Sequence, residues 1–315
     1  MQFTTKIPVQ KSSFPIDYDS KIMLLGSCFV ENMGNKFDYF KFQATTNPFG
    51  IIFNPVSLKK IIERSVQKNY FSENDIFFHN ESWHCFEVHS ELSNPDKDTF
   101  LESLNDLIRL TNQQLNDSTH IIITLGTSWV YRNIESNEIV ANCHKVPQKQ
   151  FTKELLSINQ TEESLQSIIS LIHSVNPNCN FIFTVSPVRH IKDGFVENTL
   201  SKAHLVAALH FSISQLPSSN YFPAYEIMMD ELRDYRFYTE DMLHPNQTAI
   251  DYIWIQFFEN YISESVFGLM NEIGSIQKGL KHRPFNPNTE SHQKFLEATK
   301  IKIGKIQEKL QHIHF

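Results

Sequence analysis

Glycine and cysteine are scarce in this 315-residue chain, which contains nine glycines and four cysteines. The cysteines are widely scattered and form no C-x-x-C pair. Their spacing excludes the usual zinc ribbon and does not suggest a disulfide framework, so a reducing cytoplasm fits best. Neither G-x-x-x-x-G-K-[ST] nor G-x-G-x-x-G occurs, so no nucleotide-binding loop is indicated. We expect neither a metal nor a cofactor.

Long apolar runs and an excess of positive charge are also absent. The longest apolar runs span about seven residues, far short of the ~20 needed to cross a membrane. No basic segment followed by an apolar one marks a signal peptide. The net charge is −7 and the pI is about 6.0, which argues against nucleic acid or an anionic membrane as a partner. We therefore expect a cytoplasmic protein that binds neither.

Short apolar runs alternate with helical patterns along the chain, which predicts a doubly wound parallel sheet. Three of the nine glycines, Gly26, Gly50 and Gly126, stand where expected strands end. Residues 1–315 form one expected domain, with a helical extension from about 265 packed on it. The expected strands are 21–26, 40–46, 120–126 and 180–188; the expected helices are 29–40, 57–67, 97–115, 163–175, 201–216 and 290–313; and hairpins are expected within 70–93 and 128–147.

The stretch "KIMLLGSCFVENMG", residues 21–34, puts a serine and a cysteine directly after a buried strand. Ligands of doubly wound sheets bind outside the carboxyl ends of the strands. Ser27 lies there, beside the free N–H groups of a helix start, which are the donors that an oxyanion needs. A serine becomes a good nucleophile only when a base takes its proton.

The best source of that base is "YTEDMLHPNQTAIDYIW", where Asp241 and His244 are three residues apart just before a helix. A D-x-x-H on a loop lets the carboxylate fold back onto the imidazole and fix its tautomer. The other ring nitrogen is then free to take the proton of the serine. Ser27, His244 and Asp241 are therefore the predicted nucleophile, general base and orienting acid.

Six blocks of the sequence also resemble the GSCFA family: "LGSCFVENMG", "TNPFGIIFNP", "TLGTSWVYR", "ANCHKVP", "TVSPVRH" and "YFPAYEIMMDELRDYRFYTEDMLHPN". This family is related to the SGNH (GDSL-like) hydrolases and the plant polysaccharide esterases. The resemblance implies a three-layer α/β/α fold, a serine in the first block and a late D-x-x-H. It implies a serine ester hydrolase that acts through an acyl-enzyme on a small acyl ester, such as a carbohydrate O-acyl group.

The resemblance further implies an oxyanion hole built by the serine N–H, a glycine after the second strand and an asparagine after the third. Gly50 in "NPFG" would be the glycine. Where relatives have G-x-N-D, this chain has "GTSW", so Ser128 replaces the asparagine. Thr127, Ser128 or Asn47 would then have to supply the third donor.

Two alternatives remain open at the first block. Where relatives have G-D-S this chain has G-S-C, so a strict alignment makes Cys28 the nucleophile. A thiol at a helix N-terminus is chemically suited to that role. Ser27 is preferred because it directly follows the strand-ending glycine.

Two further residues are candidates for binding substrate. Arg189 follows the strand 180–188 and would lie at the same sheet edge as Ser27, and His144 follows a hairpin. The same residues would also suit an acyltransferase to a sugar hydroxyl, or a glycan-binding protein that has lost efficient chemistry. The "GTSW" departure favours a binding protein, and the intact D-x-x-H favours an enzyme.

Overall fold

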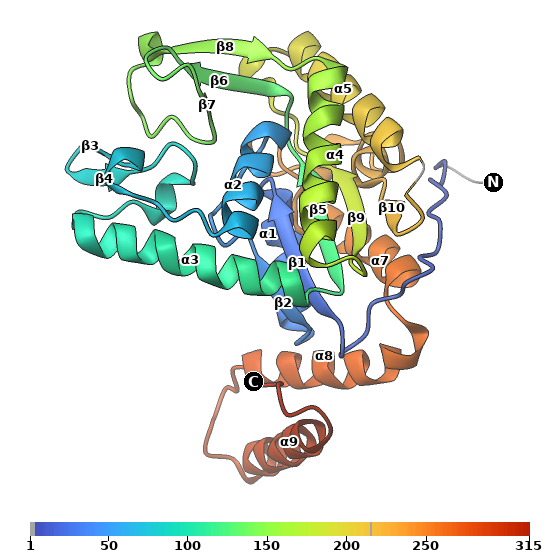
Figure 1. Cartoon of the computed structure of the whole chain (residues 1–315). Coiled ribbons are helices and arrows are strands. Elements are labelled where there is room, and N and C mark those ends of the chain that lie inside the picture. Colours follow the sequence, from blue (N-terminus) through green and yellow to red (C-terminus); the bar gives the residue numbers. More distant parts are fainter. Residues whose placement is uncertain (1–3, 215) are drawn as a thin grey trace.

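A computed structural model describes residues 4–214 and 216–315 of the chain. Its centre is a parallel five-stranded sheet in the order β2-β1-β5-β9-β10 (Figure 1). The strands are β1 (Lys21–Gly26), β2 (Gln43–Thr46), β5 (His120–Leu125), β9 (Asn180–Val185) and β10 (Ser219–Tyr221). The sheet is wound in both directions from β1, so the predicted doubly wound α/β fold is confirmed.

Helices cover both faces of this sheet because successive strand residues point to opposite sides. Met23 and Leu25 of β1 pack in one hydrophobic core with α2, α3, α4 and α5. Ile22 and Leu24 pack in a second core with α1, α7 and α8. The helices are α1 (Phe29–Tyr39), α2 (Pro55–Gln67), α3 (Lys97–Asp117), α4 (Ile158–Val175), α5 (Phe195–Ile213), α6 (Ala224–Glu226), α7 (Gln247–Tyr261), α8 (Phe267–Lys281) and α9 (Glu290–Lys309). The helix expected over 201–216 includes Gln215, which lies outside the described residues.

Gly26 ends β1 in a conformation that only glycine adopts easily, with φ of +128°. A Cβ atom there would lie 2.1 Å from the carbonyl oxygen of Thr124 on β5, so any side chain would collide with backbone. The expectation that Gly50 also ends a strand is wrong. β2 ends at Thr46, and Gly50 closes a turn in which its N–H donates to the carbonyl of Asn47 at 2.8 Å.

Two insertions lie beside the core of the fold. The first is the expected hairpin, reduced to β3 (Phe77–His79) and β4 (Ser82–His84). The second contains β6 (Trp129–Asn133), β7 (Ile139–Val140) and β8 (Phe151–Leu155), and β8 was not expected from the sequence. The insertions are joined by hydrogen bonds from the N–H groups of Ala141 and Asn142 to the carbonyl of Phe86.

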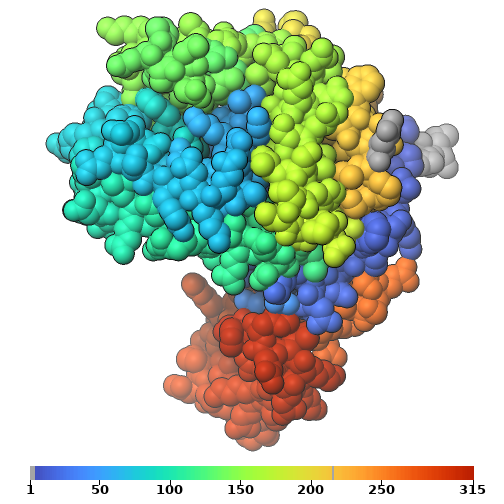
Figure 2. All heavy atoms as spheres, viewed as in Figure 1, coloured from blue at the N-terminus to red at the C-terminus, as the bar shows by residue number. Residues whose placement is uncertain are grey.

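The C-terminal helices form a protrusion on the α/β body, drawn in red in Figure 2. Helix α8 contacts α1 through hydrogen bonds from Tyr39 Oη to the Gly274 carbonyl and from Gln277 Nε2 to the Tyr39 carbonyl. Helix α9 contributes Ile306 to the second core. Among the described residues, no helix has the length and apolar character needed to span a bilayer.

Candidate active site

Ser27, the predicted nucleophile, is completely buried behind the end of β1. Its N–H donates to the Thr124 carbonyl at 3.0 Å, so it is not available to an oxyanion. Its Cβ packs close to the backbone of Gly126. Within the described residues its hydroxyl has no hydrogen-bond partner. Ser27 therefore lies where β1 meets β5, with its hydroxyl enclosed by the protein.

Cys28, the alternative nucleophile, caps the N-terminus of α1 and is partly exposed. Burial raises the pKa of its thiol, and Glu31 adds to the rise. Lys202 and the backbone N–H groups of Cys28 and Phe29 oppose it, because they stabilise the thiolate. The thiol therefore carries its proton at neutral pH and needs a base, but its surroundings contain charge that favours ionisation.

The predicted contact between Asp241 and His244 is present on the loop before α7. His244 Nδ1 lies 2.6 Å from Asp241 Oδ2. The other carboxylate oxygen accepts hydrogen bonds from Thr239 Oγ1 and from the N–H groups of Leu243 and His244. These bonds hold the pKa of Asp241 far below its usual value. The carboxylate stays charged and fixed, and in the described part of the chain His244 Nε2 has no partner.

Arg189, whose role in binding substrate stays a prediction, holds this loop in place. Its Nη2 donates to the Met242 carbonyl at 2.6 Å, and its N–H donates to the Leu243 carbonyl at 3.4 Å. The guanidinium also lies over the rings of Tyr238 and Tyr235, at 4.7 and 5.5 Å from their centroids. These contacts tie the end of β9 to the D-x-x-H loop, whereas Arg189 Nε is buried without a hydrogen-bond partner among the described residues.

The expected third oxyanion donors are also engaged within the protein. Asn47 accepts from the Gly26 N–H and donates to Glu31, and Ser128 is buried with its N–H and hydroxyl bonded to Ser201 of α5. The Thr127 hydroxyl lies 3.0 Å from Ser201 Oγ and accepts from the Trp129 N–H. Each side chain orients backbone at the sheet edge, and these contacts argue against a role for any of them as a free donor.

His144 lies in the insertions rather than beside the loop of His244. It is buried, and its Nε2 lies 2.7 Å from the Cys85 carbonyl. Its ring packs on His84 and Phe77. Burial lowers the pKa of His144 to about 4, so the ring is neutral. These contacts join the two insertions to each other and leave no face of the ring for a substrate.

Two residues of the site had no predicted role. Lys202 of α5 is fully buried, and its Nζ donates to the carbonyls of Gly126 and Ser186, each at 2.8 Å. His190 packs its ring edge-to-face on Phe53. Burial, then Lys202 and His244, lower the pKa of His190 to about 3. The signal missed in the sequence was a lone lysine on the otherwise uncharged face of α5 that meets the sheet.

A model of the GSCFA family matches residues 21–257, and a model of the GSCFA C-terminal domain matches residues 273–315. The chain belongs to the GSCFA family. Among solved structures, it is similar to an acetyl xylan esterase from the rumen bacterium Butyrivibrio proteoclasticus, with 10% identity and a TM-score of 0.37. That match covers 82% of this chain and 66% of the esterase chain, just under two thirds of its length. No curated protein matches.

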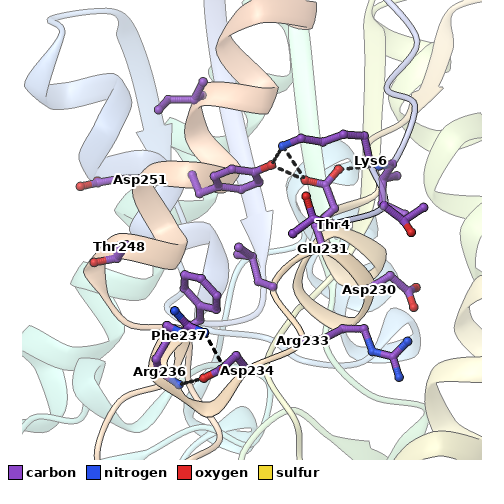
Figure 3. A pocket seen from close by; sticks show the side chains of 15 residues that line it. Thr4, Lys6, Asp230, Glu231, Arg233, Asp234, Arg236, Phe237, Thr248 and Asp251 are labelled. Carbon is purple, nitrogen blue, oxygen red and sulfur yellow. Dashed lines mark hydrogen bonds and ion pairs between the residues drawn. The ribbon is translucent and has the colours of Figure 1, made fainter. Parts of the chain in front are cut away.

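The GSCFA chain also has a cavity of about 990 Å³ beside the D-x-x-H loop (Figure 3). Arg236 and Phe237 of that loop line it, together with Lys6 and the buried Glu231. Glu231 accepts hydrogen bonds from the Ile7 N–H and Tyr252, and pairs with Lys6. Neither Cys28 nor His244 lines this cavity, so the cavity is separate from the candidate active site. The described residues contain no cluster of His, Cys, Asp and Glu suited to a metal ion.

Proposed function

We propose that this GSCFA chain is an ester hydrolase that acts through an acyl-enzyme, with His244 as general base and Asp241 as its orienting carboxylate. The observation that carries the proposal is the 2.6 Å contact between Asp241 and His244 Nδ1. It fixes the tautomer that leaves Nε2 able to accept a proton. The low pKa of Asp241 supports the role, because a permanently charged carboxylate stabilises the imidazolium that forms.

Cys28 is the nucleophile in this proposal. Its partial exposure and its place at the N-terminus of α1 support that choice over Ser27, whose hydroxyl is buried and whose N–H is engaged. Within the described residues the N–H groups of Cys28 and Phe29 donate to no carbonyl, as is usual at a helix start. They are the two donors that would hold an oxyanion at this point of the sheet edge.

The reaction has two halves. His244 Nε2 takes the thiol proton while Cys28 Sγ bonds to the acyl carbon, and the tetrahedral oxyanion rests on the two N–H groups. Collapse breaks the C–O bond to the alcohol, and His244 returns the proton to the leaving oxygen. Water then attacks the thioester, giving its proton to His244, and the C–S bond breaks to release the acid and regenerate the thiol.

The proposed substrate is a small acyl ester, specifically an O-acyl group on a carbohydrate. This part rests on the resemblance of the sequence to the SGNH hydrolases and plant polysaccharide esterases. An acyl group at the sheet edge would face Cys28 and His244, and the carbohydrate would lie on the surface around them.

The test is to incubate the protein with p-nitrophenyl acetate, quench it with acid and map the acetyl group by peptide mass. We expect acetylation of Cys28, its loss in Cys28→Ala and its retention in Ser27→Ala. Ser27→Ala should fold normally, because the hydroxyl that it removes has no partner in the described residues. His244→Ala should slow acetylation by about 10²- to 10⁴-fold, the usual share of a general base.

His312→Ala is the matched control, because His312 is an exposed histidine near the end of the chain. Its acetylation rate should equal that of the wild type. Acetylation of Ser27 would show that the serine, and not Cys28, is the nucleophile. If neither residue is acetylated, the hydrolase proposal fails.

A further inference from the structure

Lys202 is the most unusual charged group in the molecule. Its side chain is completely enclosed between α5 and the carboxyl ends of β5 and β9, and no carboxylate of the described residues pairs with it. Taking an ammonium out of water without an opposite charge strongly destabilises a folded protein. An apolar side chain of the same length would fill this space at lower cost.

The two carbonyl contacts satisfy only part of the hydrogen-bonding capacity of this ammonium group. Nζ donates to Gly126 and Ser186 at 2.8 Å, which leaves one of its three N–H groups without an acceptor in the described residues. Gly126 directly follows β5 and packs against Ser27, the residue before Cys28. Lys202 therefore lies next to the ends of the strands, where the proposed nucleophile, Cys28, is located.

The groups that face Lys202 come from three other elements. The Cys28 thiol at the start of α1 attracts its charge, and the ring of Tyr225 in α6 lies 5.6 Å from Nζ. His190 after β9 is kept neutral by burial and by this charge. Glu31, also on α1, acts on Cys28 with the opposite sign. Of these groups, a Cys28 thiolate is the one whose negative charge Lys202 would directly balance.

We propose that Lys202 is a positioning residue whose buried positive charge stabilises the Cys28 thiolate and so prepares the thiol for acyl transfer. The inference rests on the proposed function in treating Cys28 as the nucleophile. Burial lowers the pKa of Lys202 to about 7, and its attraction to the Cys28 thiolate opposes that shift. Near neutral pH, ionisation of the thiol and protonation of the lysine then favour each other.

The test measures how fast iodoacetamide alkylates Cys28 across a range of pH, with each cysteine followed separately by peptide mass. Two variants remove the charge in different ways. Lys202→Met keeps the length of the side chain, and Lys202→Gln keeps two N–H donors for the Gly126 and Ser186 carbonyls. In both, the pH midpoint of Cys28 alkylation should rise, and the rate near neutral pH should fall by about tenfold for each unit of that rise.

Cys143 supplies an internal control, because burial raises the pKa of its thiol to about 11 and Lys192 is the cation that opposes this rise. Lys192→Met should shift the alkylation profile of Cys143 and leave that of Cys28 unchanged. An unchanged Cys28 profile in folded Lys202→Gln would overturn the proposal. A shift in Lys202→Met alone would also overturn it, because hydrogen bonding rather than charge would then explain the effect. Alkylation needs no ester, so failure of the hydrolase proposal would appear separately, in the acetylation experiment.

Discussion

Ser27 and Cys28 are neighbours in the chain, but their side chains have opposite environments. Ser27 is completely buried and bonded through its N–H to Thr124 of β5, whereas Cys28 lies at the start of α1 and is partly exposed. Both residues follow Gly26, whose positive φ ends the strand. Two residues that are adjacent in the chain thus differ in their exposure to solvent.

The buried charge of Lys202 makes the stability of the fold depend on pH. Its pKa is about 7 in the folded protein, against an ordinary value of 10.5 that applies when the chain is unfolded. Between these two values the unfolded chain binds more protons, so the free energy of unfolding rises with pH. The slope contributed by this one group approaches about 1.4 kcal/mol per pH unit.

Urea denaturation between pH 7 and about 10, for the wild type and Lys202→Gln, measures this contribution. The difference between the two profiles removes what the tyrosines and cysteines contribute to both. We expect the wild type to gain stability relative to the variant as the pH rises through this window. A constant difference would mean that Lys202 keeps an ordinary pKa in the folded state.

At the scale of elements, the site depends on a loop rather than on a strand. Asn246 caps α7 by accepting from the Ala249 N–H, and its Nδ2 donates to the Arg236 carbonyl at 2.7 Å. Arg189 holds the opposite side of the same loop through the Met242 carbonyl. The position of His244 is therefore set by a helix cap and by an arginine, both outside the D-x-x-H itself.

Asn246→Ala should reduce the free energy of unfolding by about 1–2 kcal/mol, as loss of a helix cap usually does. It should also slow acetylation of Cys28, because the loop that carries His244 loses an anchor. Thr289→Ala removes a comparable cap from α9, where Thr289 accepts from the His292 N–H. This control should lose stability without changing the acetylation rate. Equal acetylation rates in the two variants would show that the Asn246 cap does not position His244.

At the scale of the whole molecule, the C-terminal helices are attached through the second hydrophobic core. Ile306 of α9 is 2% exposed and belongs to that core, whereas Ile301 on the same helix is 61% exposed. Ile306 therefore tests whether the protrusion and the α/β body unfold together. This bears on the prediction of one domain over residues 1–315.

Ile306→Ala should cost about 2–5 kcal/mol in a single cooperative transition, as is typical of a buried isoleucine. Ile301→Ala, the control, should change the free energy of unfolding by less than about 0.5 kcal/mol. Thermal unfolding followed by calorimetry distinguishes the alternatives. Two separate transitions, with only the smaller one affected by Ile306→Ala, would contradict the single domain.

Local patterns predicted most of the fold because the buried strands and amphipathic helices carry their periodicity in the sequence. The hydrophobic run 120–126 became β5, and the apolar face of 29–40 became α1. Strand β8 was missed because its burial pattern is mixed, with two exposed residues following the buried Phe151. Gly50 was misplaced because a glycine that closes a turn looks the same in sequence as one that ends a strand.

The sequence by itself was enough to predict the family, the alternation of strands and helices that makes a parallel sheet, and the pairing of Asp241 with His244. Each of these predictions uses patterns of residues that are close in the chain. The tertiary structure alone decided the environments of Ser27, Cys28 and Lys202. Burial and charge at the sheet edge come from segments far apart in sequence, such as β1, β5 and α5. No periodicity or spacing encodes those distances, and it is these distances that set which groups are exposed and which protons they hold.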